Sequence, residues 1–263
     1  MKRSTFQYGF LLILASALLV IFIAVLNFRP DKPNAPALKA TPADSSTPEL
    51  KFVLNWPFGE DESANIVSAD LLTTNIYVVF DGSGSMDDAG CSGGQKKVRS
   101  AKRALIAFAD SLPIDANLGM LAFDRTGITE RVALRGRNRQ LFKSSVEQVS
   151  PGGGTPLKFA IEEAYGRLTD QGKKQLGYGE YHLVVVTDGA ASEGQDPTII
   201  VSAVLKDSPV IVHTVGFCIS ENHSLNQPGR TLYRTANDAK SLQQGLQTVL
   251  AESPSFTTTE FNQ

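Results

Sequence analysis

The sequence predicts an α/β domain with a mostly parallel central sheet and helices on both faces, preceded by one transmembrane helix. Short apolar runs rich in β-branched residues alternate with segments whose apolar residues recur at helical spacing, a pattern typical of parallel sheets. At the N-terminus, the run from Tyr8 to Phe28 contains no Asp, Glu, Lys or Arg. Its length matches the apolar core of a bilayer, so we expect one folded domain held at a membrane.

The N-terminal run favours an uncleaved signal anchor over a cleaved signal peptide. As a helix it would be roughly 30 Å long, and Lys2 and Arg3 precede it. A cleaved signal has a shorter apolar core and small residues soon after it, whereas Asn27–Asp31 follows here. We therefore expect residues 1–8 in the cytoplasm, 9–28 across the membrane and the rest on the extracytoplasmic side.

The composition of the chain between this run and the folded domain predicts a spacer. Residues 29–49 contain five prolines and no aromatic residue. Such a segment cannot build a core and is typical of an extended linker. Residues 50–72 either pack on the domain or lead into it, and Lys51–Trp56 is either a strand or such a packed segment. We expect the domain itself at 73–252 and a C-terminal tail at 253–263.

The elements of the domain follow in order along the chain. Apolar runs predict strands, with a short antiparallel hairpin partner as the third: Ile76–Phe80, Leu118–Phe123, Arg131–Leu134, His182–Thr187, Val210–Val215 and Thr231–Arg234. Helical spacing predicts the helices Lys97–Leu112, Gln140–Val149, Thr155–Leu168, Thr198–Leu205 and Asp238–Leu250. We expect Thr155 to cap its helix and Pro156 to be the first helical residue.

The charge distribution argues against nucleic-acid binding. The net charge is -2, which provides no field that would neutralise phosphates. Basic residues cluster in two places, which we interpret as a solvated helix face and a solvated turn: Lys96, Lys97, Arg99, Lys102 and Arg103, and Arg131, Arg135, Arg137 and Arg139.

Oxygen-bearing side chains follow two of the predicted strands. Asp81, Ser83 and Ser85 follow the first strand and Asp188 follows the fourth, while a glycine-rich loop leads to Thr155. Ligands of parallel sheets bind outside the carboxyl ends of the strands, so we expect these groups at one edge. Hydroxyls and carboxylates suit a hard divalent cation. If the hydroxyls bind it directly, the ion keeps charge with which to attract an outside carboxylate.

Three other motifs share some of these letters and fail. An EF-hand beginning at Asp81 would need Gly and Glu where Met86 and Ser92 stand. No strand is followed by the Gly-Lys-Ser/Thr ending of a phosphate-binding loop. The Gly82–Ser85 stretch does not fit the Gly-x-Ser-x-Gly frame of a hydrolase nucleophile elbow.

Three ordered segments together resemble the metal site of the von Willebrand factor type A domain family: Phe80–Met86, Gly153–Leu157 and Val186–Gly189. The resemblance implies a Rossmann-like sheet with one short antiparallel edge strand. It also implies a metal-ion-dependent adhesion site formed by Asp81, Ser83, Ser85, Thr155 and Asp188. The expected ion is Mg²⁺, with Mn²⁺ or Ca²⁺ as alternatives, and the expected partner is a protein that presents Asp or Glu. The loop after the motif, Asp87–Gly94, is longer than usual for the family.

Other titratable residues favour structural roles. We interpret Asp87 as a solvated loop charge, Asp124 as a turn residue, and His182 and His213 as packed core histidines. No hydrolytic triad is evident. The resemblance implies a binding protein in adhesion or envelope complex assembly, and we expect no enzyme. The alternatives are a metal-dependent enzyme, with Asp87 or Asp124 as its base, and a structural domain with a non-functional site.

The two cysteines both follow strands at the same predicted edge. Cys91 lies in the loop after the first strand and Cys218 lies just past the fifth. An oxidising compartment allows a disulfide between them, which would join two loops beside the metal site. Two unpaired thiols are the alternative.

Overall fold

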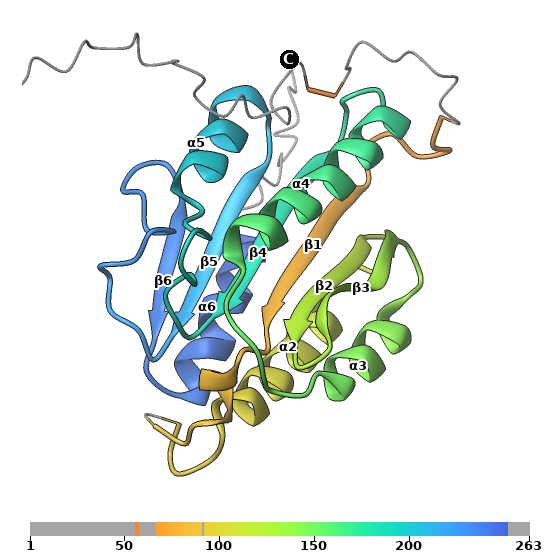
Figure 1. The fold of residues 1–263 in the computed structure, drawn as a ribbon. Coiled ribbons are helices and arrows are strands. Elements are labelled where there is room, and N and C mark those ends of the chain that lie inside the picture. Colours follow the sequence, from red (N-terminus) through yellow and green to blue (C-terminus); the bar gives the residue numbers. More distant parts are fainter. Residues whose placement is uncertain (1–55, 58–66, 91, 252–263) are drawn as a thin grey trace, which may run out of the picture. The chain divides into compact units, whose positions relative to one another are not determined.

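The computed structural model describes residues 56–57, 67–90 and 92–251 (Figure 1). The expected anchor, the linker, most of the 50–72 segment and the C-terminal tail lie outside these ranges. Among the described helices, none has the length and apolar character needed to cross a bilayer. The chain divides into two units, Met1–Pro48 and Glu49–Gln263, and every described residue belongs to the second.

The domain is built on a sheet of six strands in the order β3-β2-β1-β4-β5-β6. The neighbouring strands pair in parallel, except that β2 and β3 are antiparallel. This confirms the mostly parallel sheet with an antiparallel edge. The strands are β1 (Thr74–Asp81), β2 (Asn117–Asp124), β3 (Gly127–Arg135), β4 (Glu180–Thr187), β5 (Ile211–Phe217) and β6 (Leu232–Ala236).

The prediction of a short edge strand is wrong. Strand β3 has nine residues and pairs along β2 from Leu118 to Asp124. Only Val132 of this strand is buried, because an edge strand has one neighbour and much of it faces solvent. Its sequence therefore lacks the continuous apolar run that identifies the central strands.

Helices cover both faces of the sheet (Figure 1). Helices α2 (Lys97–Ser111), α3 (Arg139–Gln148) and α6 (Ala239–Ala251) pack on one face, and α4 (Leu157–Lys174) and α5 (Thr198–Asp207) pack on the other. Alternate residues of the central strand β1 enter the two cores, with Val78 and Phe80 in one and Tyr77 and Val79 in the other. All four are fully buried, which explains the continuous apolar run.

Helix α4 begins one position later than expected. Its first residue is Leu157 and its N-cap is Pro156, which has no side-chain cap bond, so Thr155 is not the cap. The backbone of Thr155 is engaged instead by a neighbouring loop, because its carbonyl accepts a bond from Ser192 N–H at 3.0 Å. The Thr155 hydroxyl is thereby not used at the helix terminus.

Trp56 packs against the domain at the start of β4 and the end of α4. Its ring centroid is 4.9 Å from that of Tyr181 and 6.0 Å from that of Tyr165. Gly172 leaves room for this ring, since a Cβ there would lie 2.6 Å from a Trp56 ring carbon. Of the expected Lys51–Trp56 segment, only Trp56 is described, and it is in contact with the domain.

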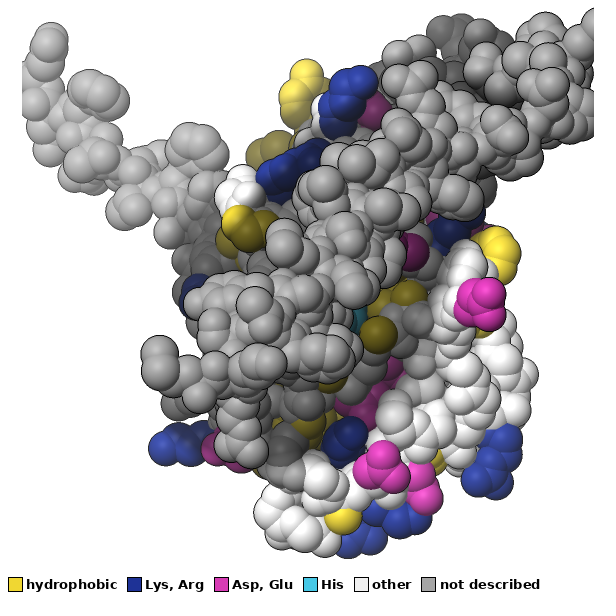
Figure 2. All heavy atoms as spheres, turned by 60° about the vertical axis from the view of Figure 1, so that its left-hand side comes forward, with side chains coloured by type: hydrophobic (Ala, Val, Ile, Leu, Met, Phe, Trp, Pro, Cys, Tyr) yellow, Lys and Arg dark blue, Asp and Glu magenta, His cyan; other side chains and the backbone are white. Residues whose placement is uncertain are grey.

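The described surface carries charges of both signs. In the face drawn in Figure 2, acidic and basic side chains lie next to one another near the lower edge rather than in a field of one sign. Ion pairs such as Lys96–Asp87 and Lys143–Asp110 belong to this surface. The parallel strands all end at the edge that carries the loop after β1 (Figure 1), and the predicted site residues lie there.

Candidate metal site at the carboxyl edge of the sheet

The loop after β1 turns sharply because Gly82 sits against its neighbours. A Cβ at this position would lie 2.7 Å from a Val149 methyl and 2.9 Å from the Asp124 Cβ. Gly82 N–H also donates to the Phe123 carbonyl at 2.8 Å. A short 3-10 helix, η1 (Gly84–Asp87), follows and was not predicted. The turn and this helix place the side chains of the loop above the ends of the strands.

Hydrogen bonds join the acids and hydroxyls of two segments into one group. The Ser83 and Ser85 hydroxyl oxygens are 3.1 Å apart, and the Ser85 hydroxyl donates to Asp188 Oδ1 at 2.8 Å. Asp81 Oδ1 accepts a bond from Ser83 N–H at 2.7 Å, and Asp81 Oδ2 accepts one from the Thr187 hydroxyl at 2.6 Å. Thr187, which holds Asp81 in place from the end of β4, has no sequence signal of this role.

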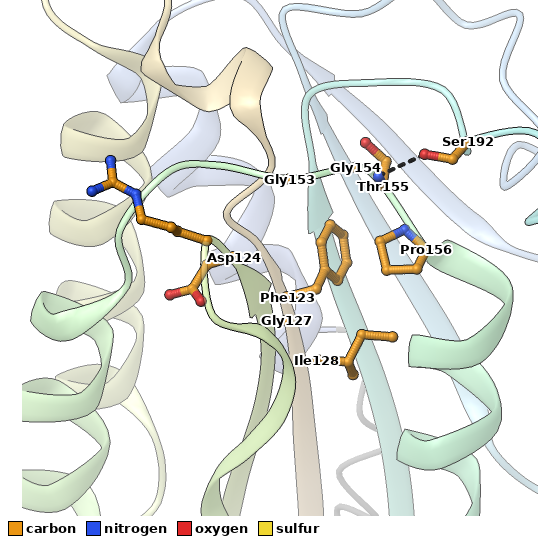
Figure 3. Close-up of a pocket in the computed structure, with 10 residues that line it drawn as sticks. Phe123, Asp124, Gly127, Ile128, Gly153, Gly154, Thr155, Pro156 and Ser192 are labelled. Carbon is orange, nitrogen blue, oxygen red and sulfur yellow. Dashed lines mark hydrogen bonds between the residues drawn. The ribbon is translucent and has the colours of Figure 1, made fainter.

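Thr155 joins this group through the backbone of its loop. Gly84 N–H donates to the Gly153 carbonyl at 3.1 Å, and Gly152 N–H donates to the Gly82 carbonyl at 2.9 Å. Thr155 N–H donates to the Ser192 hydroxyl at 2.8 Å (Figure 3). The structure thus brings all three predicted segments to one edge, with Thr155 itself 8% exposed.

Burial has the largest influence on the pKa of Asp81. Its removal from water raises the pKa to about 6, and the Asp188 carboxylate adds to this. Hydrogen bonds from Ser83 and Thr187 act in the opposite direction, because they stabilise the ionised form. At pH 7 Asp81 is therefore mostly ionised and provides negative charge beneath the hydroxyls.

The donor set fits a hard divalent cation. All five predicted groups offer oxygen, the atom that Mg²⁺ and Ca²⁺ prefer. Two neighbouring ligands of an octahedral Mg²⁺ at about 2.1 Å are about 3.0 Å apart, and the Ser83 and Ser85 oxygens are separated by 3.1 Å. Within the described ranges, no three His, Cys, Asp or Glu side chains form a metal cluster, so a cation here needs the hydroxyls.

For Lys97, the prediction of a solvated helix face is wrong. We expected it on a solvated helix face, but its side chain is only 11% exposed and its ammonium lies 2.8 Å from Asp188 Oδ2. The Asp188 side chain is fully buried. A lysine at the first position of a helix gives no sequence signal of burial, because charged residues there are commonly solvated. Lys96, one residue earlier, is exposed as expected.

Two other acids of this edge, Asp124 and Asp87, are engaged by neighbouring groups. Asp124 accepts bonds from Thr126, Arg131 and the backbone N–H of Ser150, which join the β2–β3 turn to the next loop. Burial acts to raise the Asp124 pKa, but these donors outweigh it and the pKa is lowered. Asp87 is exposed and pairs with Lys96 at 2.7 Å. Both match their predicted roles.

A cavity of about 280 Å³ opens beside Thr155 (Figure 3). In Figure 3, Phe123, Ile128 and Pro156 point toward one another below Thr155 and Ser192. Asp124 and Arg125 complete one side of this cavity. The candidate site therefore has an apolar hollow on the β2–α4 side.

Cys218 lies at the predicted edge, directly after β5. Its sulfur is 3.5 Å from the Gly90 carbonyl oxygen. Cys91 lies outside the described residues, so its pairing with Cys218 stays a prediction. The contact shows that the chain next to Cys91 comes close to Cys218.

The class of the domain is defined by its three-layer α/β fold with acids and hydroxyls at the carboxyl edge of the sheet. The sequence profile of the von Willebrand factor type A domain matches residues 75–262. The chain therefore belongs to the von Willebrand factor type A domain family, as the resemblance implied.

The chain is also similar to a bacterial relative and to two solved structures. Uncharacterized protein YwmD of Bacillus subtilis is 31% identical over 193 residues, which cover 65% of this chain and 82% of the relative. Proximal thread matrix protein 1 from the mussel byssus, with a zinc-occupied MIDAS motif, has a TM-score of 0.55 and 17% identity over 68% of this chain and 47% of that chain. Manganese-loaded TRAP protein of Plasmodium vivax has a TM-score of 0.51 and 21% identity over 68% and 74% of the two chains.

Proposed function

We propose that this chain is a membrane-tethered protein-binding module. A divalent cation held by Ser83, Ser85 and Thr155, with Asp81 and Asp188 behind them, accepts an Asp or Glu side chain from the partner. The role is in adhesion or in the assembly of an envelope complex. The observation that carries the proposal is the close approach of the two serine hydroxyls next to two buried carboxylates.

The chemistry of these ligands explains why an acidic partner is favoured. Neutral hydroxyls bound directly to the cation leave most of its charge uncompensated, so an additional carboxylate is attracted. One structural neighbour has a zinc-occupied MIDAS motif and another is manganese-loaded. Those likenesses concern the fold, and they support a divalent cation of the same general kind here.

The membrane tether is proposed from the sequence alone. Residues 9–28 lie outside the described part of the structure, and the charge-free run from Tyr8 to Phe28 supports a helix that crosses the bilayer. The extracytoplasmic location of the domain follows from the same argument.

The described geometry favours binding over catalysis. A metal-dependent enzyme would need a general base beside the cation. Asp124 is a weak candidate because its hydrogen bonds lower its pKa and occupy its oxygens, and Asp87 is engaged with Lys96. We therefore propose that the domain is not an enzyme. A structural domain with an inactive site is the rival that metal titration separates from our proposal.

The test compares the Asp81→Ala and Ser83→Ala variants with the unaltered protein. We expect calorimetry to show Mg²⁺ or Mn²⁺ binding that is lost in Asp81→Ala and weakened in Ser83→Ala, while circular dichroism shows both folded. Proteins captured from the membrane fraction in Mg²⁺ but released by chelator should be absent from the Asp81→Ala sample.

The matched control is Asp87→Ala, which removes an exposed carboxylate from the same loop. We expect its metal affinity and its captured proteins to equal those of the unaltered protein. Partner capture by Asp81→Ala that persists in chelator would contradict the proposed function.

A further inference from the structure

Lys97 places an ammonium group inside the candidate metal site. Its ammonium is 2.8 Å from Asp188 Oδ2, while Asp188 Oδ1 accepts the Ser85 hydroxyl at 2.8 Å. Both side chains are largely removed from water, so solvent and salt screen the interaction little. Asp188 thus contacts both the ammonium of Lys97 and the hydroxyl of Ser85, which would bind the metal.

The charges of this group can be counted. The two carboxylates of Asp81 and Asp188 and the ammonium of Lys97 together carry one negative charge. The nearby pair of Lys96 and Asp87 is exposed and neutral overall. A divalent cation would turn the charge of the group into one positive charge, and one carboxylate from a partner would then make it neutral.

Without Lys97 the net charge of this group would differ. The group would carry two negative charges, a divalent cation would neutralise them fully, and little electrostatic attraction would remain for a partner's acid. We propose that Lys97 couples metal binding to partner binding: it weakens the hold of the site on the cation alone and strengthens the attraction of the occupied site for a carboxylate. This inference rests on the metal-bridged contact proposed above.

Helix α2 gives Lys97 a fixed position for this role. Lys97 is the first residue of the helix, and its N–H donates to the Asp88 carbonyl at 2.9 Å, which ties the helix start to the loop that carries Ser83 and Ser85. Lys97 is therefore a positioning residue that acts through Asp188. It does not contact the cation in our proposal.

The test is calorimetric titration of Mn²⁺ into the full-length chain in detergent, with the variants Lys97→Met and Lys97→Arg. We expect Lys97→Met to bind Mn²⁺ about tenfold more tightly or better, because a nearby positive charge has been removed from a poorly solvated site. Lys97→Arg keeps the charge and should bind Mn²⁺ as the unaltered protein does. The matched control is Lys96→Met, which makes the same change of charge at an exposed pair and should alter the affinity less than about twofold.

The coupling is measured with acetate as a simple carboxylate. Replacing chloride by acetate at constant ionic strength should tighten Mn²⁺ binding to the unaltered protein and have a smaller effect on Lys97→Met. Metal-free Lys97→Met should also melt at a lower temperature, since Asp188 loses its cationic partner, and saturating Mn²⁺ should raise its melting temperature more than that of the unaltered protein.

Each outcome decides between the two proposals. If Lys97 has only a structural role, the Lys97→Met variant will be less stable but will not bind Mn²⁺ more tightly. That result would overturn this inference and leave the proposed function standing. An equal acetate effect in both proteins would do the same. Failure of the unaltered protein to bind Mn²⁺ or Mg²⁺ at all would overturn the proposed function, and this inference with it.

Discussion

His182 and His213 face one another inside the sheet, on β4 and β5. Their ring nitrogens are 3.0 Å apart, and the residues are 1% and 3% exposed. One ring must donate to the other, which two neutral imidazoles can do and two protonated ones cannot. Burial lowers the pKa of His213 to about 3, with His182 adding to the effect. The prediction of packed core histidines is confirmed.

This pair predicts a loss of stability in acid. Between pH 6.5 and about pH 3 the unfolded chain binds a proton at His213 and the folded chain does not, so the free energy of unfolding falls as the pH falls. The loss from His213 between pH 7 and pH 5 should be about 2 kcal/mol. Urea unfolding at both pH values should show a correspondingly smaller loss in His213→Gln. An identical pH dependence in the two proteins would contradict this assignment.

At the scale of residues, the candidate site could be predicted where several residues together form a motif. Asp81, Ser83, Ser85, Thr155 and Asp188 could be predicted as one group because parallel strands deliver their carboxyl ends to one edge. Lys97 could not, because its burial depends on the path of the Asp87–Lys96 loop and on where Asp188 points. Thr187 could not either, since its hydroxyl looks like any other in a buried strand.

Helix α4 supports two regions of the molecule at once. Its start follows the Thr155 loop, and its end receives Trp56 against Gly172. The chain contains one tryptophan, so fluorescence reports on this contact directly. The helix also holds a second glycine, Gly166, where an added Cβ meets no atom within 4 Å.

These two glycines predict opposite effects of the same substitution. Gly172→Ala should displace the Trp56 ring, shift its emission to the red and lower the free energy of unfolding by about 1–3 kcal/mol. Gly166→Ala should leave the emission unchanged and stabilise the helix by up to about 1 kcal/mol. Emission spectra and urea unfolding measure both effects. Unchanged emission in Gly172→Ala would show that Trp56 does not pack there.

At the scale of elements, the central strands and the five α-helices of the described residues could be predicted because their periodicity is strong. The start of α4 was placed one residue early, since Thr-Pro is a typical cap sequence and the competing bond from Ser192 is made by a distant loop. Strand β3 was predicted too short because its exposed residues carry little apolar signal. Helix η1 depends on local turn geometry and has no periodicity to detect.

The whole domain has two ends with different roles. Trp56 packs on Tyr181 at the beginning of β4, whereas Asp188 follows the end of the same strand. Seven residues of extended chain separate these positions by about 23 Å. Trp56 thus contacts the domain at the edge of the sheet opposite the candidate metal site.

The proposed tether predicts where the protein is found in cells. The full chain should sediment with membranes and resist extraction by alkaline carbonate, because an apolar helix holds it in the bilayer. A variant that lacks residues 1–48 should remain in the supernatant. Protease added outside the cytoplasm should digest the domain. A full chain recovered mainly in the supernatant, or one that has lost residues 9–28, would favour a cleaved signal instead.

The proposed disulfide between Cys91 and Cys218 predicts a chemical protection. Alkylation of the denatured protein without reductant should leave its mass unchanged, and alkylation after reduction should add two groups. The contact between Cys218 and the Gly90 carbonyl supports this pairing. Two alkylated thiols without reductant would contradict it.

The most direct test of the whole account is a crystal structure of the domain grown with Mn²⁺, with the ion located by its anomalous scattering. We predict a single strong peak bounded by the Ser83, Ser85 and Thr155 hydroxyls, with Asp81 and Asp188 next to it and Lys97 still in contact with Asp188. An ion-free edge at saturating Mn²⁺, or three hydroxyls that point to different places, would contradict the account.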